Sequence, residues 1–252
     1  MLPAAFLETP IAHRGLHDRE DGRPENSMEA FQAAVDNGYG IELDLQLTAD
    51  IRALAFHDYD LARLTGADGL VQDRTSAEMA DLPLIGGATG APLLEDVLAM
   101  VQGRVPLLIE LKDQDGALGD NVGLLETATA KALEAYTGPV AVMSFNPHAV
   151  AVLQSLAADI PRGLVTEEFD PGVWKIEAAY AAALNTVANY DRVGASFISH
   201  NHKHLSMPPI AEFRAAGASV LCWTIRSPEQ EAAARRVADN VTFEGYLPAV
   251  AS

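Results

Sequence analysis

Short apolar segments alternate with longer helical patterns along almost the whole chain, and this alternation constrains the fold more than any other feature. Eight segments have the character of buried strands: residues 10–13, 40–44, 106–111, 139–144, 162–165, 196–199, 219–224 and 241–244. Helical patterns fall between them, at residues 27–37, 93–102, 120–136, 147–157, 173–188, 208–216 and 228–238. Such alternation is typical of βαβ units around a parallel sheet. Eight strands in 252 residues favour an α/β fold of the TIM (β/α)8 barrel type over a doubly wound sheet.

One further strand-like segment, residues 52–57, does not fit the barrel pattern. It follows the second strand too closely for a parallel crossover, which needs about a dozen residues or more. We therefore expect a hairpin arm after the second barrel strand, with Thr48, Ala49 and Asp50 near its turn. The arm would bring His57 back to the top of the barrel. Residues 58–92 then form a small insertion, with short helical turns near 61–64 and 76–81, inside a single domain of residues 1–252.

Charge and cysteine content exclude several classes of function. Seventeen basic residues against 35 acidic ones give a net charge of −18, which repels nucleic acid and anionic lipid headgroups. A small anionic substrate would therefore need a local cationic centre. The single cysteine, Cys222, excludes a disulfide framework and a cysteine-based zinc site. No apolar run approaches the ~20 residues of a membrane span. The first ten residues show no signal-peptide pattern, so we expect a cytoplasmic protein.

Acidic side chains gather where strands end, which is where active sites lie in such barrels. Glu42 and Asp44 are two residues apart, so on a strand they point to the same face. Glu110 would add a third carboxylate from the next barrel strand. Three hard oxygen ligands favour one divalent cation, Mg²⁺ or Ca²⁺. The alternative for Glu42 and Asp44 is a salt-bridged or solvated acid pair.

Two histidines and two cationic side chains lie at or beside the ends of the same predicted strands. His13 and His57 stand at or beside strand ends, where imidazole can serve as acid or base near neutral pH. Arg14 and Lys112 could clamp a phosphate. Displacement at phosphorus needs one group to deprotonate the nucleophile and one to protonate the leaving oxygen. Alternatively, the histidines have only a structural role, and the two cations only form ion pairs with nearby acids.

A set of short motifs appears in order along the chain: IAHRG (11–15), PENS (24–27), IELD (41–44), Thr48 with Asp50, FHD (56–58), IELK (109–112), SF (144–145) and CWTI (222–225). In this order the motifs resemble the glycerophosphodiester phosphodiesterase family. The resemblance implies a TIM barrel with an insertion after the second strand. It also implies a divalent metal and hydrolysis of glycerophosphodiesters to glycerol 3-phosphate and an alcohol.

The resemblance also implies roles for particular residues. By their motifs, His13 and His57 match the acid/base pair of the family, while Glu42, Asp44 and Glu110 match its metal ligands. The implied substrate contacts are Arg14 and Lys112 at the phosphate, Asn26 beside the site, Trp223 at the glycerol pocket, and Phe145. In the family the glycerol 2-hydroxyl is thought to attack phosphorus and give a cyclic phosphate that water opens.

Several features leave alternatives open. The last strand ends in Phe243-Glu244, where the family usually has Thr-Asp, so Glu244 stands in for the aspartate. In the loop from His200 to His204, His200 is the best candidate for a substrate contact, although such loops are more often only exposed. The insertion has few aromatics, which favours small deacylated substrates, but the headgroup and the oligomeric state cannot be read.

Three rival functions remain at this stage. The first is a related phosphodiesterase on lipid, similar to a phospholipase or a sphingomyelinase D. The second is an amidohydrolase-type metal barrel, for which the His-x-His motif at the first strand is missing. The third is a non-catalytic barrel that serves as a binding module.

Overall fold

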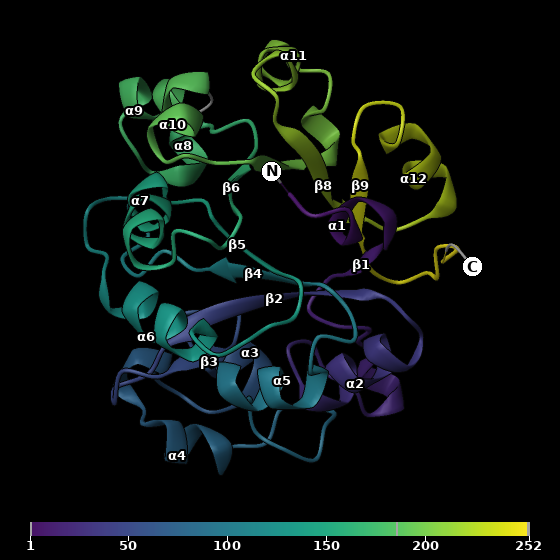
Figure 1. Cartoon of the computed structure of the whole chain (residues 1–252). Coiled ribbons are helices and arrows are strands. Elements are labelled where there is room, and N and C mark those ends of the chain that lie inside the picture. Colours follow the sequence, from purple (N-terminus) through teal and green to yellow (C-terminus); the bar gives the residue numbers. More distant parts are fainter. Residues whose placement is uncertain (1, 185, 251–252) are drawn as a thin grey trace.

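The computed structural model describes residues 2–184 and 186–250 and shows a closed barrel of eight parallel strands (Figure 1). The barrel strands are β1 (Ile11–Ala12), β2 (Gly40–Leu47), β4 (Leu107–Leu111), β5 (Val140–Ser144), β6 (Arg162–Thr166), β7 (Phe197–Asn201), β8 (Ser219–Ile225) and β9 (Asn240–Phe243). The barrel closes because β1 pairs in parallel with both β2 and β9. The predicted TIM barrel is confirmed, and each expected strand overlaps an observed one.

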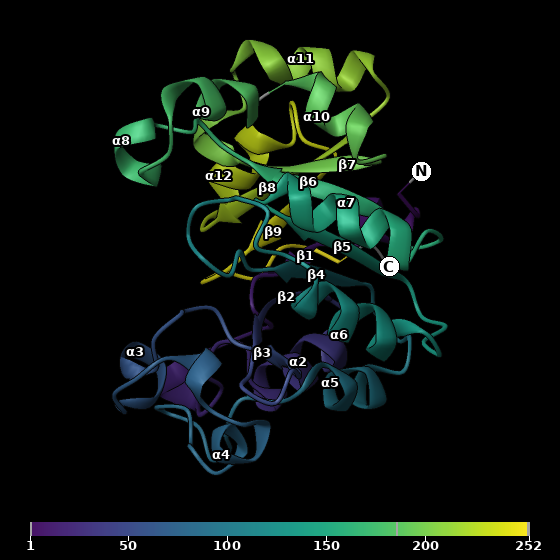
Figure 2. The same cartoon turned by 90° about the vertical axis from the view of Figure 1, so that its left-hand side faces the viewer.

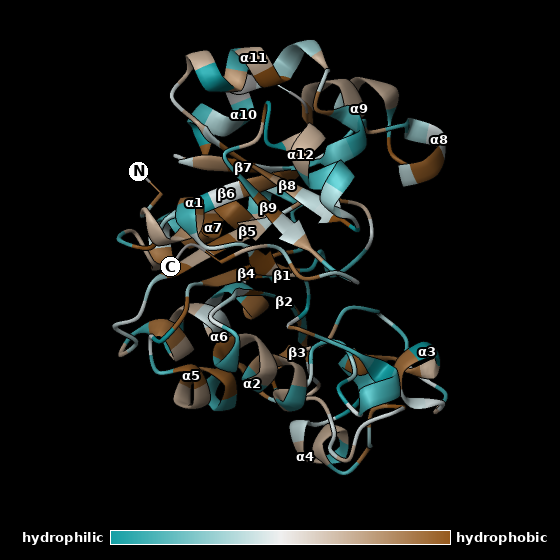
Figure 3. Cartoon of the chain, turned by 90° about the vertical axis from the view of Figure 1, so that its right-hand side faces the viewer, coloured by the Kyte–Doolittle hydropathy of each residue, from teal (hydrophilic) through white to brown (hydrophobic). Residues whose placement is uncertain are grey.

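Helices surround the barrel, and most coincide with the expected helical segments. They are α2 (Met28–Asp36), α5 (Leu94–Val101), α6 (Leu124–Leu133), α7 (Pro147–Leu156), α11 (Pro208–Ala215) and α12 (Pro228–Ala234). Local sequence accounts for two of the starts, since the Ser27 and Ser227 side chains accept hydrogen bonds from the backbone N–H groups of Ala30 and Gln230. Figure 3 shows the apolar residues concentrated in the strands that these helices cover.

The expected helix over residues 173–188 is wrong, because this stretch lies in three short helices. They are α8 (Pro171–Trp174), α9 (Ala178–Leu184) and α10 (Val187–Arg192), and residue 185 lies outside the described residues. The first break has a local cause, since Lys175 adopts a left-handed conformation with φ 55° that ends α8. Figure 2 shows α8 at the outer end of this group, next to α9.

The hairpin arm is present as predicted. β3 (Ala53–Ala55) pairs antiparallel with β2, with Leu45 opposite Ala55 and Leu47 opposite Ala53. The insertion that follows contains α3 (Ala62–Thr65), the 3₁₀ turn η2 (Val71–Asp73) and α4 (Ser76–Ala80). It has an apolar cluster of its own, which includes Phe56, Leu61 and Met79. Figure 2 shows α3 and α4 outside the ring of barrel helices.

Three further short elements complete the fold, and one of them closes the bottom of the barrel. They are α1 (Ala5–Glu8) and the 3₁₀ turns η1 (Arg19–Asp21) and η3 (His202–His204). Phe6 of α1 is fully buried and packs with interior residues that include Leu108 and Phe197. The Asn240 side chain holds α1 in place by donating to the carbonyl of Phe6 at 2.8 Å. Within the described residues, no helix combines the length and the apolar composition that crossing a bilayer requires.

Replacing Phe6 by alanine is expected to lower the free energy of unfolding by about 3–5 kcal/mol, because it leaves a cavity in a closed interior. Urea unfolding of the wild type and the variant measures the difference. Leu124→Ala serves as the control, since Leu124 is 57% exposed and its loss should change stability by about 0.5 kcal/mol at most. A loss near that of the control would show that Phe6 does not fill the barrel in solution.

Candidate active site

The carboxyl ends of the strands deliver their side chains into one small cavity. It is lined by His13, Arg14, Glu42, Asp44, His57, Glu110, Lys112, Met143, Phe145, Ser199, Trp223 and Thr242. Strand geometry explains part of this set, because Glu110, Ser199 and Trp223 each follow an interior residue by two positions. Of the site residues predicted from the sequence, only Asn26 and His200 are absent from the lining.

The three predicted metal ligands lie together in this cavity. Glu42, Asp44 and Glu110 are buried, and one carboxylate oxygen from each lies within 4.8 Å of the others. The ammonium Nζ of Lys112 lies 2.8 Å from Asp44 Oδ1 and 2.6 Å from Glu110 Oε1. Arg14 Nε lies 3.1 Å from Asp44 Oδ2. Three acids thus face two cations, which leaves one negative charge without a partner in this group.

Burial and neighbouring charges shift the carboxyl groups in opposite directions. Burial disfavours ionisation of Asp44, but Lys112 and Arg14 outweigh it and hold the pKa of Asp44 well below its usual range. Burial, with Asp44 and Glu110 nearby, raises the pKa of Glu42 well above its usual range. The uncompensated charge therefore falls on Glu42, where either a proton or a metal ion can neutralise it. A buried set of three oxygen donors with one charge unbalanced fits a hard divalent cation.

Arg14 and Asn26 hold the acid cluster in shape from the first loop. The Asn26 side chain donates from Nδ2 to Asp44 Oδ2 at 2.9 Å and accepts from the Asp44 N–H at 3.2 Å, so it positions Asp44. The Arg14 backbone N–H donates to Glu42 Oε2 at 3.0 Å. The buried Arg14 Nε has no aligned hydrogen-bond acceptor among the described residues, although Asp44 is near. An unsatisfied buried guanidinium N–H is a ready donor for an anionic ligand.

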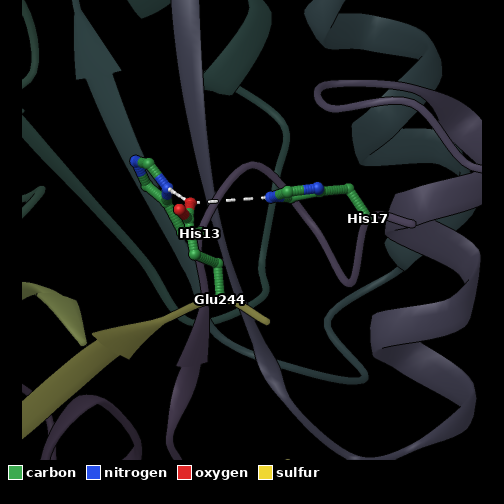
Figure 4. Close-up of side chains that lie close together, drawn as sticks. All are labelled: His13, His17 and Glu244. Atoms are coloured by element: carbon green, nitrogen blue, oxygen red, sulfur yellow. Dashed lines mark hydrogen bonds and ion pairs between the residues drawn. The ribbon is translucent and has the colours of Figure 1, made fainter. Parts of the chain in front are cut away.

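His13 is held by a carboxylate from the last strand (Figure 4). His13 Nδ1 lies 2.5 Å from Glu244 Oε2, and His17 Nε2 lies 3.6 Å from the same oxygen. Arg226 Nε donates to the other Glu244 oxygen at 2.7 Å. The second ring nitrogen of His13, Nε2, lies 4.0 Å from Glu42 Oε2. Burial lowers the pKa of His13 despite the nearby Glu244, which favours the neutral imidazole.

His57 is held by a chain of ion pairs that the sequence did not reveal. Its Nδ1 lies 2.7 Å from Asp58 Oδ1, and Arg63 of α3 donates from Nε to Asp58 Oδ2 at 2.7 Å. Arg63 also donates from Nη1 to Glu25 Oε2 at 2.7 Å, and Glu25 in turn accepts from Arg14. Burial, followed by the charge of Lys112, lowers the pKa of His57 to about 4. Through Arg63, the insertion thereby links His57 to Arg14.

His200 does not reach the cavity. It is 1% exposed, with Nδ1 2.8 Å from Thr166 Oγ1 and Nε2 3.2 Å from the carbonyl oxygen of His204. Both ring nitrogens are engaged within the protein. The geometry therefore gives no support to the expected substrate contact, and His200 ties β6, β7 and η3 together.

Polar and aromatic groups face each other across the small cavity. The Ser199 and Thr242 hydroxyls are buried and lack hydrogen-bond partners among the described residues. The rings of Phe145 and Trp223 meet edge to face, with centroids 5.7 Å apart. Trp223 Nε1 donates to the Ser199 carbonyl at 3.0 Å. A small polyol would find both apolar surface and free hydroxyl partners here.

A second cavity of about 440 Å³ opens beside the first. The two share His57, Glu110, Lys112 and Phe145. Trp174 from α8 and Tyr59 from the insertion line only the larger one. Sequence reasoning missed Trp174, since the chain gives no local signal that α8 reaches over the barrel mouth.

The chain is similar to known proteins both in sequence and in fold. The glycerophosphoryl diester phosphodiesterase family model matches residues 13–241. The Bacillus subtilis protein YhdW, named as a candidate glycerophosphodiester phosphodiesterase, is 30% identical over 232 residues, which cover 88% of each chain. A glycerophosphodiester phosphodiesterase of Bacillus altitudinis is 41% identical over 109 residues, or 40% of this chain and 43% of that one. A solved structure of an Oleispira antarctica phosphodiesterase with the product sn-glycerol-3-phosphate has a TM-score of 0.75 at 22% identity, covering 96% of this chain and 93% of that one.

Proposed function

Because the chain belongs to the glycerophosphoryl diester phosphodiesterase family, we propose that it hydrolyses glycerophosphodiesters to glycerol 3-phosphate and an alcohol in the cavity between His13 and His57. One observation carries the proposal: two histidines, three carboxylates and two cations line a single cavity at the carboxyl ends of the barrel strands. This set of side chains suits the attack of an oxygen atom on the phosphorus of a phosphodiester anion. The product named for the Oleispira relative, sn-glycerol-3-phosphate, agrees with this reaction.

Glu42, Asp44 and Glu110 are proposed to hold one divalent cation, Mg²⁺ or Ca²⁺. Bound there, such an ion supplies Lewis-acid chemistry, which lowers the pKa of a hydroxyl and offsets phosphate charge. The unsatisfied Nε of Arg14, and Lys112 beside it, are proposed to contact the phosphate oxygens. These two cations then stabilise the charge that shifts onto the oxygens as the phosphorus is attacked.

The two histidines are proposed to divide the proton transfers by position. His13 lines only the small cavity, where Ser199, Thr242 and Trp223 could hold the glycerol, so His13 takes the proton of the glycerol 2-hydroxyl. The hydroxyl oxygen bonds to phosphorus, and the bond from phosphorus to the alcohol oxygen breaks. His57 lines both cavities and gives its proton to that departing oxygen. In the second stage, water opens the cyclic phosphate with the two roles reversed.

Burial favours the neutral form of both histidines, which is consistent with this order. A neutral His13 can accept a proton as it stands. His57 has its pKa lowered to about 4, mainly by burial and Lys112, and therefore needs the substrate's negative charge to become an acid. Substrate binding would thus raise the pKa of His57 and allow it to act as the acid.

A panel of glycerophosphodiesters, assayed with Mg²⁺ and Ca²⁺ before and after chelation, tests the proposed function. We expect glycerol 3-phosphate and the free alcohol as products, quantified separately. A phosphorylated alcohol with free glycerol would mean that the other ester bond breaks. No hydrolysis of any diester by metal-loaded protein would end the proposal.

Glu244→Gln is expected to lower kcat by about 10–100-fold with little change in KM, because the carboxylate only orients His13 and its proton. The ¹⁵N chemical shifts of the His13 ring should move in this variant, since the tautomer loses its anchor. Glu231→Gln, in which an acid of α12 that pairs with Arg235 loses its charge, serves as the control and should leave both quantities unchanged. An effect confined to KM would show that Glu244 contacts the substrate instead.

A further inference from the structure

Two imidazole rings and one carboxylate meet on the side of His13 that points away from the acid cluster. Figure 4 shows the Glu244 carboxylate between the rings of His13 and His17. One donor atom from each of the three residues lies within 4.8 Å of the others. The contact between Glu244 and His13 serves the proposed mechanism. His17 has no part in that mechanism, and at 3.6 Å its Nε2 is too far from Glu244 Oε2 for a good hydrogen bond.

The donor atoms of this group differ from those of the acid cluster. Two imidazole nitrogens and one carboxylate oxygen suit Zn²⁺ and similar transition-metal ions, whereas three carboxylates suit Mg²⁺ or Ca²⁺. Ligand atoms about 2.0–2.2 Å from a tetrahedral zinc ion lie about 3.3–3.6 Å from one another. Glu244 Oε2 lies 2.5 Å from His13 Nδ1 and 3.6 Å from His17 Nε2, so small side-chain rotations are enough to reach this geometry.

The surrounding chain holds the three side chains close together before any ion binds. Arg226 donates to Glu244 Oε1 at 2.7 Å, which leaves Oε2 facing the two histidines. The loop that carries both histidines turns tightly against α2. Gly15 in this loop has a φ of 80°, and a Cβ there would lie 2.8 Å from the carbonyl carbon of Ala30. Ligands that are already in position lose less conformational freedom when an ion binds.

An ion can reach these three residues without entering the active site. A cavity of about 700 Å³ is lined in part by His17, Arg226 and Glu244. Its described lining residues include none of those that line either active-site cavity. The side chains of His17 and Glu244 are 27% and 19% exposed. A bound substrate would therefore leave this approach open.

We propose that His13, His17 and Glu244 bind one transition-metal ion of the Zn²⁺ class, and that this ion inhibits the proposed reaction. Without the ion, the Glu244 carboxylate can only accept, so a neutral His13 carries its proton on Nδ1 and keeps a lone pair on Nε2 to act as the base. The ion takes the lone pair of Nδ1. The Nδ1 proton leaves and Nε2 gains one from water, so the imidazole stays neutral but cannot accept the proton of the substrate hydroxyl. The inhibition rests on the proposed function, whereas the coordination does not.

Zinc titration at saturating Mg²⁺ or Ca²⁺ tests the inhibition, with each variant compared to its own rate without zinc. We expect saturating Zn²⁺ to lower kcat about 10²-fold or more, because it removes the base. In His17→Ala the zinc concentration for half inhibition should rise by about tenfold or more, since a direct ligand matters at least as much as an outer partner. His148→Ala, which removes a histidine of α7, should keep the wild-type response. Equal sensitivity of His17→Ala, with relief by added Mg²⁺, would place zinc at the acid cluster and overturn the inference.

Binding is measured separately from activity. The ring ¹⁵N resonances of His13 and His17 should both shift when Zn²⁺ is added, and those of His148 should not. By calorimetry, Glu110→Gln should still bind zinc, because Glu110 belongs only to the acid cluster. Unchanged resonances of His13 and His17 at saturating zinc would overturn the inference. If the metal-loaded protein hydrolysed no diester without zinc, the proposed function would fail, while the resonances and calorimetry would still decide whether this site exists.

Discussion

His13→Ala and His57→Ala are each expected to lower kcat by about 10²–10⁴-fold, the usual contribution of a positioned acid or base. His13 faces the carboxylates from the small cavity, and His57 lies between the two cavities, so neither can replace the other. Steady-state kinetics at saturating Mg²⁺ or Ca²⁺ measures the loss. We expect KM to change far less than kcat, because both groups act mainly as the reaction proceeds.

A histidine away from the cavity provides the control for this prediction. His148, in the first turn of α7, lies outside both cavities, and His148→Ala should retain wild-type kcat. Circular dichroism establishes that all three variants are folded. If His13→Ala and His57→Ala both kept near-normal kcat, the two-histidine mechanism would be wrong, whatever the family membership suggests.

Chelation is expected to lower kcat/KM by about 10³-fold, because a bound divalent ion provides several kcal/mol of charge stabilisation in reactions of this type. Added Mg²⁺ or Ca²⁺ should restore the activity. The structural reason is the charge balance of the acid cluster, in which Lys112 and Arg14 offset only two of three carboxylates. Metal content after dialysis must be measured alongside activity, so that retained ion is not mistaken for independence from metal.

Amide variants separate a metal role of the carboxylates from a structural one. In Glu42→Gln, Asp44→Asn and Glu110→Gln we expect weak metal binding by calorimetry, and no rise in the midpoint of thermal unfolding when metal is added. The wild type should show both. Glu95→Gln, which changes an exposed acid paired with Arg52, serves as the matched control. Unchanged metal affinity in all three cluster variants would place the ion elsewhere.

Glu244 follows the last strand at a position where the family resemblance implies an aspartate, and this difference has a structural consequence. Glu244 reaches His13 and His17 and is itself held by Arg226 (Figure 4). The sequence marked this position as different but gave no role for it. The structure assigns it a contact with the ring nitrogen of His13 that points away from the acid cluster.

The fold could be predicted from sequence because its causes are local. Apolar runs of strand length, helical patterns between them and the short spacing before the hairpin arm each act within a few residues. The positions of Glu42 and Asp44 on one face follow from the two-residue period of a strand in the same way. The motifs in order then indicated the family, and the lining of the small cavity contains most of the predicted site residues.

Tertiary structure decided the features that depend on contacts between distant segments. Phe6 fills the barrel from a helix that the sequence did not suggest, because a four-residue helix has too short a pattern to recognise. The ion pairs from Asp58 through Arg63 to Glu25 require the insertion to fold back over the first loop. Trp174 lines the larger cavity from the end of α8, where Lys175 turns the chain. The position of His200 after an expected strand predicts a place at the site. In the structure His200 is buried and forms a hydrogen bond with Thr166. Only the folded chain shows which polar groups find partners within the protein.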